Sequence, residues 1–532
     1  MKADYVFLNG QVVTVNARNE VTEAVAVKGN RILAVGTNEA MKEFVGPGTE
    51  VIDLKGNSLL PGFIDSHFHV TVRALTKITI DCYHSPDINS IGSLIEALKA
   101  KARVTPPGQW ILATNYFESR IAEKRFPTRW ELDQASTEHP IFVMRMDIHN
   151  SFVNSKALEL AGIGDHTPDP VGGHYRRDER GVPNGILVEN AHFRMFDMTR
   201  PPDGEMMKGM AIVSRELAEH GITSVHDAGG YGADDIRLMQ MASRSGVMKS
   251  RIWAFLLSLY NPRRYIETAI RAGMVTGMGD EKFRLGPVKI FVDGGSGGPN
   301  IAVRQPYSHD PNDYGTLFYT QEEINEIFIP AHAKGFQITA HANGDRAIEM
   351  MLNMFELALE KYPRPHRHRI EHAGLTQPDL LERMRKLGII VAPNPGFYKY
   401  LGDLYAKFYG ERIMHPIRSW IDAGIKPMAG SDSPCVPEFS PLLGIWGAVT
   451  RLSGSGRVYG PEQRIGIMDA IRLYTWNGAY ASFEEEIKGS IEPGKLADLV
   501  ALNGRILDVD ANGIKDLEVA LTMIDGEPVY QK

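Results

Sequence analysis

The chain has 532 residues, a formal net charge of −7 and two cysteines. This length exceeds that of one compact domain and permits a large buried core. The acidic balance disfavours nucleic-acid binding, which needs a concentrated basic patch, and two cysteines give neither a disulfide framework nor a thiolate metal site. The N-terminus does not resemble a signal peptide, and no apolar run approaches the ~18 residues that cross a bilayer, so we expect a cytoplasmic protein without a membrane segment.

Short apolar runs at both ends of the chain predict a β domain. Residues 5–15 contain two such runs around Asn9-Gly10, a dipeptide typical of hairpin turns. The turn residues Gly29-Asn30 separate two further runs, and residues 488–532 contain complementary ones. We therefore expect residues 1–58 and 488–532 to form one composite β-sandwich.

Between these ends, eight short apolar runs predict the strands of a barrel. They alternate with stretches of helical periodicity, such as Gln321–Ala333 and Pro378–Leu387. This alternation predicts an α/β fold, a (β/α)8 TIM barrel over residues 59–487. The interval from about 72 to 208 is too long for one crossover, so we expect a large insertion after the first barrel strand. The predicted strands are Phe63–His69, Ile222–His226, Arg251–Leu257, Pro287–Asp293, Gln337–His341, Arg369–His372, Ile389–Pro393 and Pro427–Asp432.

A pair of histidines in the first of these strands is the most informative feature of the sequence. His67 and His69 are separated by one residue, so in a strand they lie on the same face about 7 Å apart. Two imidazoles so placed can bind one metal ion. Taken alone the pair is weak support for a metal site, because paired histidines also occur on solvated strands and in cores.

Three later strands also end in a residue able to bind metal, namely His341, His372 and Asp432. The carboxyl ends of parallel barrel strands converge on one face, where the active sites of this fold are built. We therefore expect four histidines and one aspartate to meet in space, although they are widely separated in sequence.

The fourth predicted strand places Lys289 on the same face as Asp293. A lysine buried in a strand is costly unless it is paired or chemically altered. Two interpretations stay open: a salt bridge to a neighbouring carboxylate, or reaction with carbon dioxide to give a carbamate that bridges two metal ions.

Together these motifs resemble the amidohydrolase superfamily, and in particular its branch of N-substituted formamide deformylase-like hydrolases, the YtcJ-like or amidohydrolase family 3 group. The resemblance extends over almost the whole chain. The matching segments are Pro61–His69, Val288–Gly294, His341–Ala347, Arg369–His372, Gly430–Pro434 and Gly489–Val500.

The resemblance implies roles for individual residues. One divalent ion, zinc being the first candidate, or two ions would be held by imidazoles, a carboxylate and a carboxylated lysine. A metal-activated hydroxide would attack the substrate, and Asp432 would take its proton and pass it to the leaving nitrogen. The catalytic residues would be Asp432, Lys289, His341 and His372. The metal ligands would be His67, His69, Lys289, His341, His372 and Asp432.

The implied reaction is hydrolysis of an amide-type carbon–nitrogen bond in a small molecule, with N-substituted formamides as the first candidate class. Carbamates, cyclic ureas and cyclic amides remain open, as does deamination on the same site. A ring deaminase is disfavoured because Gly344 stands where many deaminases carry a proton-shuttling glutamate. The loop Gly295–Asn300 also departs from the branch, which suggests a different specificity. An alternative of another class is a catalytically silent sensor or scaffold on the same fold.

Six further polar residues are weaker candidates for substrate contacts, each with an ordinary structural role as the alternative: Asn115, Glu118, His149, His226, Asp293 and Tyr314. From the general behaviour of such enzymes we expect a homodimer, with neither nucleic acid nor membrane as a partner.

Overall fold

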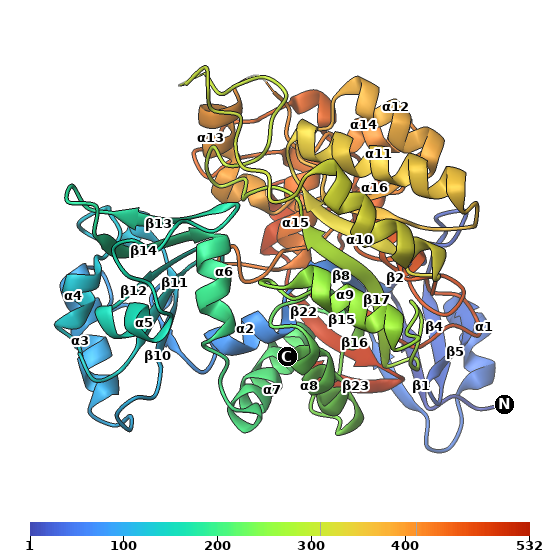
Figure 1. Ribbon diagram of the computed structural model, residues 1–532. Helices are drawn as coiled ribbons and strands as arrows, with labels where there is room; N and C mark the ends of the chain where they lie inside the picture. The colour runs from blue at the N-terminus through green and yellow to red at the C-terminus, as the bar shows by residue number, and fades with distance from the viewer. Residues whose placement is uncertain (309, 411) are drawn as a thin grey trace.

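A computed structural model describes residues 1–308, 310–410 and 412–532 (Figure 1). Its centre is a seven-stranded parallel sheet, in the order β20-β19-β18-β17-β16-β15-β8. Each strand is wholly or almost wholly buried, which suits the continuous apolar runs read from the sequence. The strands are β8 (Phe63–Phe68), β15 (Ile222–Asp227), β16 (Arg251–Leu256), β17 (Phe283–Phe291), β18 (Ile338–Ala342), β19 (Arg369–His372) and β20 (Ile390–Ala392).

An eighth extended segment, residues 427–433, closes this sheet into a barrel. On one side Met428 N donates to Val391 O at 3.0 Å, and on the other Asp432 N donates to His67 O at 2.7 Å. The segment therefore bridges β20 and β8 without forming a regular ladder of its own. The predicted α/β barrel is confirmed.

Helices cover the outside of the barrel (Figure 1). Thr320 caps α10 in a reciprocal capping box with Glu323, and Gly388 ends α12 in a left-handed conformation, so both helices have the bounds predicted from the sequence. These helices are α7 (Asp203–Glu219), α8 (Ala233–Arg244), α9 (Pro262–Arg271), α10 (Gln321–Ala333), α11 (Asp345–Lys361), α12 (Pro378–Leu387), α13 (Phe397–Tyr409), α14 (Ile417–Asp422), α15 (Pro441–Thr450), α16 (Ile467–Leu473) and α17 (Trp476–Ala481).

The chain between β8 and α7 contains a separate six-stranded sheet, in the order β13-β14-β12-β11-β10-β9, at the left of Figure 1. This sheet and helix α3 share a core that includes Leu94, Ile111, Ile141 and Phe152. The elements are α2 (Val70–Thr76), β9 (Ile80–Asp81), α3 (Ile91–Ala102), β10 (Ile111–Tyr116), α4 (Arg129–Asp133), β11 (Ile141–Arg145), β12 (Asn150–Val153), α5 (Ser155–Leu160), β13 (Gly173–Arg177), β14 (Pro183–Glu189) and α6 (Asn190–Asp197).

Strands from both ends of the chain share a second β region, which lies below and to the right of the barrel in Figure 1. One sheet has the order β5-β4-β1-β6 and the other the order β23-β22-β21-β7-β2-β3, so only the second contains strands from both ends of the chain, which meet where β21 pairs with β7. The elements are β1 (Tyr5–Leu8), β2 (Gln11–Val13), β3 (Val21–Thr22), β4 (Ala24–Lys28), β5 (Arg31–Gly36), α1 (Asn38–Met41), β6 (Glu50–Asp53), β7 (Ser58–Pro61), β21 (Leu499–Leu502), β22 (Val519–Ile524) and β23 (Glu527–Gln531).

The expected hairpin at Asn9-Gly10 is wrong. β1 pairs with β4 and β6, whereas β2 pairs with β3 and β7 in the other sheet. The chain therefore passes from one sheet to the other at Asn9-Gly10, where Asn9 is exposed. The turn at Gly29-Asn30 does form a hairpin, with Lys28 opposite Arg31. Within the described residues, no helix has the length and apolar character needed to cross a bilayer.

Candidate metal centre

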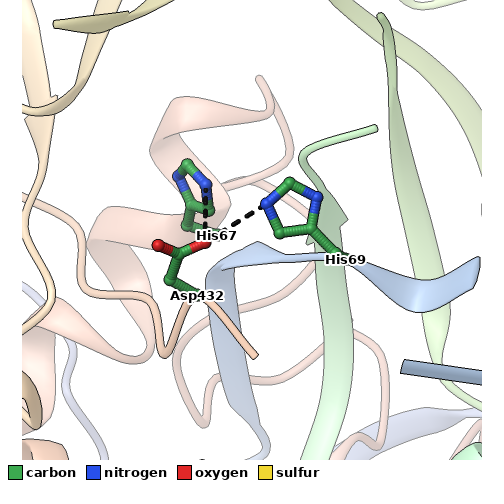
Figure 2. Close-up of side chains that lie close together, drawn as sticks. All are labelled: His67, His69 and Asp432. Carbon is green, nitrogen blue, oxygen red and sulfur yellow. Dashed lines mark ion pairs between the residues drawn. The ribbon is translucent and has the colours of Figure 1, made fainter. Parts of the chain in front are cut away.

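His67, His69 and Asp432 lie together at the carboxyl end of the barrel (Figure 2). The Oδ1 atom of Asp432 is 3.3 Å from Nε2 of His67 and 3.2 Å from Nε2 of His69. All three residues are buried, and one candidate ligand atom from each lies within 4.8 Å of the others. Asp432 adopts a left-handed backbone conformation, with φ of 57°, which turns its side chain toward β8.

The opposite ring nitrogens of the two histidines are held by acceptors. Nδ1 of His69 lies 2.6 Å from the carbonyl oxygen of Gly229, which can only accept, so Nδ1 carries the proton. Nδ1 of His67 lies 2.6 Å from Oε2 of Glu371. Both Nε2 atoms therefore present lone pairs, the arrangement that metal-binding histidines need. A set of two imidazoles and one carboxylate fits a divalent cation.

Glu371 is buried without becoming neutral. Although burial alone would raise the pKa of this carboxyl, Arg369 holds it well below its ordinary value. Nε of Arg369 lies 2.6 Å from Oε1, and the hydroxyl of Thr339 donates to the same oxygen at 2.5 Å. The carboxylate that orients His67 is therefore ionised.

His372 and His341 extend the cluster. The ring of His372 is 4.7 Å from that of His67, and the ring of His341 is 4.6 Å from that of His372, between centroids. Nδ1 of His372 donates to Oδ1 of Asn394 at 2.6 Å, which leaves Nε2 free. In His341 it is Nε2 that donates, to Gly294 O at 3.2 Å, so its lone pair is on Nδ1. The structure thus brings the four histidines close together, although among the described residues the tight three-ligand group contains only two of them.

Lys289 lies beside this group. Its Nζ atom is 3.4 Å from Nε2 of His67 and 4.9 Å from the centroid of the Phe291 ring. The side chain is fully buried, and burial lowers the pKa of the amine to about 8. In the part of the chain that the structure describes, no carboxylate oxygen forms an ion pair with it. Among the described residues, Lys289 therefore lacks the carboxylate partner that the salt-bridge interpretation requires.

A cavity of about 290 Å³ opens from the histidine cluster. Its inner wall includes His341, His372 and Asp432. Its outer walls come from the insertion and from helix α13 and the loops near it. The insertion contributes Phe117, Arg145, Met146, Asp147 and His149, and the other side contributes Phe397, Tyr400, Leu401, Leu404, Cys435, Val436 and Pro437.

Of the six weaker candidates only His149 lines this cavity. Asp293 instead accepts hydrogen bonds from the backbone N–H groups of Ala302, Asn343 and Gly344, and so fastens two loops. Glu118 forms an ion pair with Arg145 at 2.5 Å, behind the cavity wall.

The other three candidates also lie away from the cavity lining. Nδ1 of His226 accepts from Arg369 beneath the cluster. Asn115 is the penultimate residue of strand β10 and has a left-handed conformation, and Tyr314 is 41% exposed.

His149 is held by a second carboxylate. Its Nδ1 atom lies 2.6 Å from Oε2 of Glu189, and its ring centroid is 5.6 Å from that of His341. Burial alone would lower the pKa of His149, but the carboxylate of Glu189 outweighs it and raises the pKa to about 9. The carboxylate of Glu189 therefore favours the protonated form of the imidazole on the cavity wall.

Residues 50–530 match a family model described as "Amidohydrolase family". The chain belongs to the amidohydrolase family. It is 32% identical to N-substituted formamide deformylase of Arthrobacter pascens over 99% of this chain and 98% of that protein. It is 30% identical to putative amidohydrolase YtcJ of Bacillus subtilis (strain 168), with 100% of both chains covered.

A solved structure supports the same assignment. An uncharacterized metal-dependent hydrolase from Pyrococcus horikoshii OT3 matches with a TM-score of 0.77 and 25% identity, over 96% of this chain and 99% of that one. The predicted family and the prediction that the protein is an amidohydrolase, an enzyme that hydrolyses carbon–nitrogen bonds, are confirmed.

In this amidohydrolase the residues that orient the histidines are those that the sequence analysis did not single out. Glu371 stood in the same motif as His372, but strict alternation along a strand would place the two on opposite faces. The structure avoids this because His372 has φ of 67°, which breaks the alternation. Asn394 and Glu189 carried no recognisable signal, since Asn394 lies in the loop after β20 and Glu189 at the end of β14 in the insertion.

Proposed function

We propose that this amidohydrolase hydrolyses the carbon–nitrogen bond of a small N-substituted formamide and depends on a divalent metal ion. The observation that carries the proposal is the meeting of two oriented Nε2 atoms, from His67 and His69, at one oxygen of Asp432. The similarity to the formamide deformylase of Arthrobacter pascens, over nearly the full length of both chains, supports the substrate class.

His67, His69 and Asp432 would hold the first ion, and His341, His372 and a carboxylated Lys289 would complete a site for a second. Zinc suits a set of imidazoles and carboxylates. When bound, such a cation lowers the pKa of water to about 7 and polarises the carbonyl group of the substrate.

The protein's own groups have separable tasks in this proposal. Asp432 accepts a proton from the attacking water, while Glu371, Gly229 and Asn394 keep three imidazoles in the required orientation. The apolar side chains of the insertion and of α13 narrow the cavity and limit the entry of bulk water.

No specific observation favours ring deamination or a catalytically silent scaffold over the proposed hydrolysis. A Cβ atom on Gly344 would lie 1.8 Å from Ala302 O, so this loop leaves no room for the glutamate of many ring deaminases. The ordered acceptors on His67, His69 and His372 are also more than a silent scaffold requires. The homodimer, the cytoplasmic location and the absence of nucleic-acid binding stay predictions.

The test measures metal and hydrolysis on the same sample. Purified protein should contain a transition metal by mass spectrometry and release formate from formanilide, and it should lose both properties after chelation and regain them with zinc or manganese. His67→Ala should lose metal and activity together. His174→Ala is the matched control, because His174 pairs with Asp169 at 3.0 Å on the exposed surface of the insertion. Full activity in metal-free protein, or metal-loaded protein that cleaves no formamide, would contradict the proposal.

A further inference from the structure

A histidine and a glutamate of the insertion form a buried pair at the wall of the barrel cavity. Nδ1 of His149 lies 2.6 Å from Oε2 of Glu189, and the backbone N–H of Glu189 donates to His149 O at 2.8 Å. The two residues are thus joined through both backbone and side chains. Because Nδ1 is bonded to the carboxylate, Nε2 is the ring nitrogen left for a molecule in the cavity.

The buried Glu189 has an energetically unfavourable backbone conformation, which ordinary packing does not explain. It is 2% exposed, and its φ and ψ of 52° and −122° lie in a sparsely populated region for a residue with a side chain. Such strain costs on the order of 1–3 kcal/mol and tends to occur at functional sites. Its other oxygen, Oε1, has no hydrogen-bond partner among the described residues. The strained backbone thus aims an ionisable group at His149.

The glycine-rich loop after β17 is shaped around this pair. A Cβ atom on Gly295 would lie 3.1 Å from Cδ2 of His149, and one on Gly294 would lie 3.0 Å from Oε1 of Glu189. Both contacts are tighter than side chains normally allow, so glycine lets the loop pass directly against the pair. The loop Gly295–Asn300, which departs from the family pattern, therefore begins with a glycine that packs against His149 of the insertion.

We propose that His149, and not Asp432 as the resemblance implies, is the general acid that protonates the leaving nitrogen, and that Glu189 is the residue that positions it. This inference rests on the function proposed above. An amine leaves an amide readily only if its nitrogen gains a proton as the bond breaks. His149 lines the cavity from the insertion and Asp432 lines it from the last barrel segment, so the two side chains can contact the same bound substrate.

Atoms and protons balance in the proposed hydrolysis. The oxygen of water bonds to the carbonyl carbon and one water proton moves to Asp432. The carbon–nitrogen bond breaks with its electron pair on nitrogen, and that nitrogen takes the Nε2 proton of His149. Asp432 then releases a proton to solvent and His149 takes one from it. One water molecule is consumed, an acid and an amine are formed, and both side chains return to their starting states.

The experiment varies the leaving amine. Wild type, His149→Gln and Glu189→Gln are compared on 4-nitroformanilide, formanilide and 4-methoxyformanilide, whose amines increase in basicity in that order. Loss of a general acid should lower kcat/KM by about 100-fold or more for the methoxy substrate, and by less than about 10-fold for the nitro substrate, whose amine leaves without protonation. Glu189→Gln should show the same trend with smaller losses. Metal content and Tm are measured for every variant, with His174→Gln as control.

Four results would overturn the inference. Equal losses across the series would mean that His149 acts only on structure or binding, and loss of metal from His149→Gln would make it a ligand instead. If His149→Gln does not fold, an equal effect of Glu189→Gln on all three substrates would contradict the proposed role of the His149–Glu189 pair in general acid catalysis. Wild-type protein that binds metal but cleaves none of the series would contradict the proposed function itself, and the inference with it.

Discussion

Oε2 of Glu371 lies 2.6 Å from Nδ1 of His67, and this contact joins two barrel strands that are far apart in sequence. The glutamate also pairs with the fully buried Arg369, which in turn donates to the backbone oxygen of Ser66 at 2.7 Å. The orientation of the first candidate ligand is therefore fixed by a buried charge network and not by β8 alone.

Glu371→Gln should weaken metal binding by about 10- to 100-fold, because the amide accepts a weaker hydrogen bond from His67 and no longer raises the basicity of Nε2. Tm should also fall, since Arg369 loses its charged partner, a change that costs about 3–5 kcal/mol when the site is buried. A competition titration with a chromophoric chelator, below the variant's Tm, measures the affinity. Glu485→Gln is the control, because Glu485 pairs with Arg367 at 2.6 Å away from the metal centre. Unchanged affinity in Glu371→Gln would refute this role.

The barrel was predictable because buried parallel strands are continuous apolar runs followed by turn residues. Observed bounds differ from the predicted ones by only a few residues in most strands, and α10 and α12 start and stop at strong capping signals. The sequence predicted the eighth barrel strand, but not that this segment lacks a regular ladder of hydrogen bonds. Gly430 passes so close to β8 that a Cβ atom would lie 2.4 Å from His67 N, and this contact is invisible in one sequence.

The candidate site also contains some residues that could be predicted from the sequence and others that could not. Residues at strand ends, such as His341 and Asp432, could be named because the fold brings strand ends together. Residues on the insertion could not be ranked, since only the packed structure shows that His149 reaches the cavity whereas Asn115 does not. Asp293 lies at the end of a strand and still serves as a loop anchor, because three backbone N–H groups occupy its carboxylate.

Lys289 should carry a carbamate in the metal-loaded enzyme. The amine must be neutral to react with carbon dioxide, and its pKa of about 8 makes that form accessible near neutral pH. Protein reconstituted with zinc and carbon-13 bicarbonate should show a carbamate carbon resonance, and Lys289→Met should lack it. The variant should also hold one metal ion per chain where the wild type holds two, by mass spectrometry. An identical metal content and no resonance in either protein would leave Lys289 as an unmodified amine.

Gly344→Ala should lower the stability of the barrel. A Cβ atom there would lie 1.8 Å from Ala302 O, and the backbone N–H of Gly344 itself donates to Asp293 Oδ2 at 2.7 Å. Overpacking of this kind typically costs about 1–3 kcal/mol, and here backbone must move. Thermal unfolding followed by circular dichroism measures the loss. Gly164→Ala is the matched control, because nothing lies within 4 Å of its Cβ position. Equal Tm values for the two variants would show that the loop moves freely.

Asp235, in the first turn of α8, should make stability depend on pH. Its Oδ2 accepts from the Thr71 hydroxyl and from Tyr231 N, both at 2.6 Å, while the residue is 1% exposed and burial raises its pKa to about 6. The folded state therefore holds this proton more tightly than the unfolded state, where the pKa is near 3.8. The stability contributed by the protonated form is complete below about pH 4 and is lost as the pH rises through 6.

Comparison with Asp235→Asn isolates this contribution, because the amide keeps the acceptor and cannot ionise. Near pH 4 the two proteins should have similar Tm values. Toward pH 7 the wild type should become less stable than the variant by about 2–3 kcal/mol, or several degrees in Tm. Melting curves at constant ionic strength from pH 4 to 7 give the difference directly, since other titrating groups cancel. A difference that stays flat, or that favours the wild type as the pH rises, would mean that Asp235 is ionised and stabilising throughout.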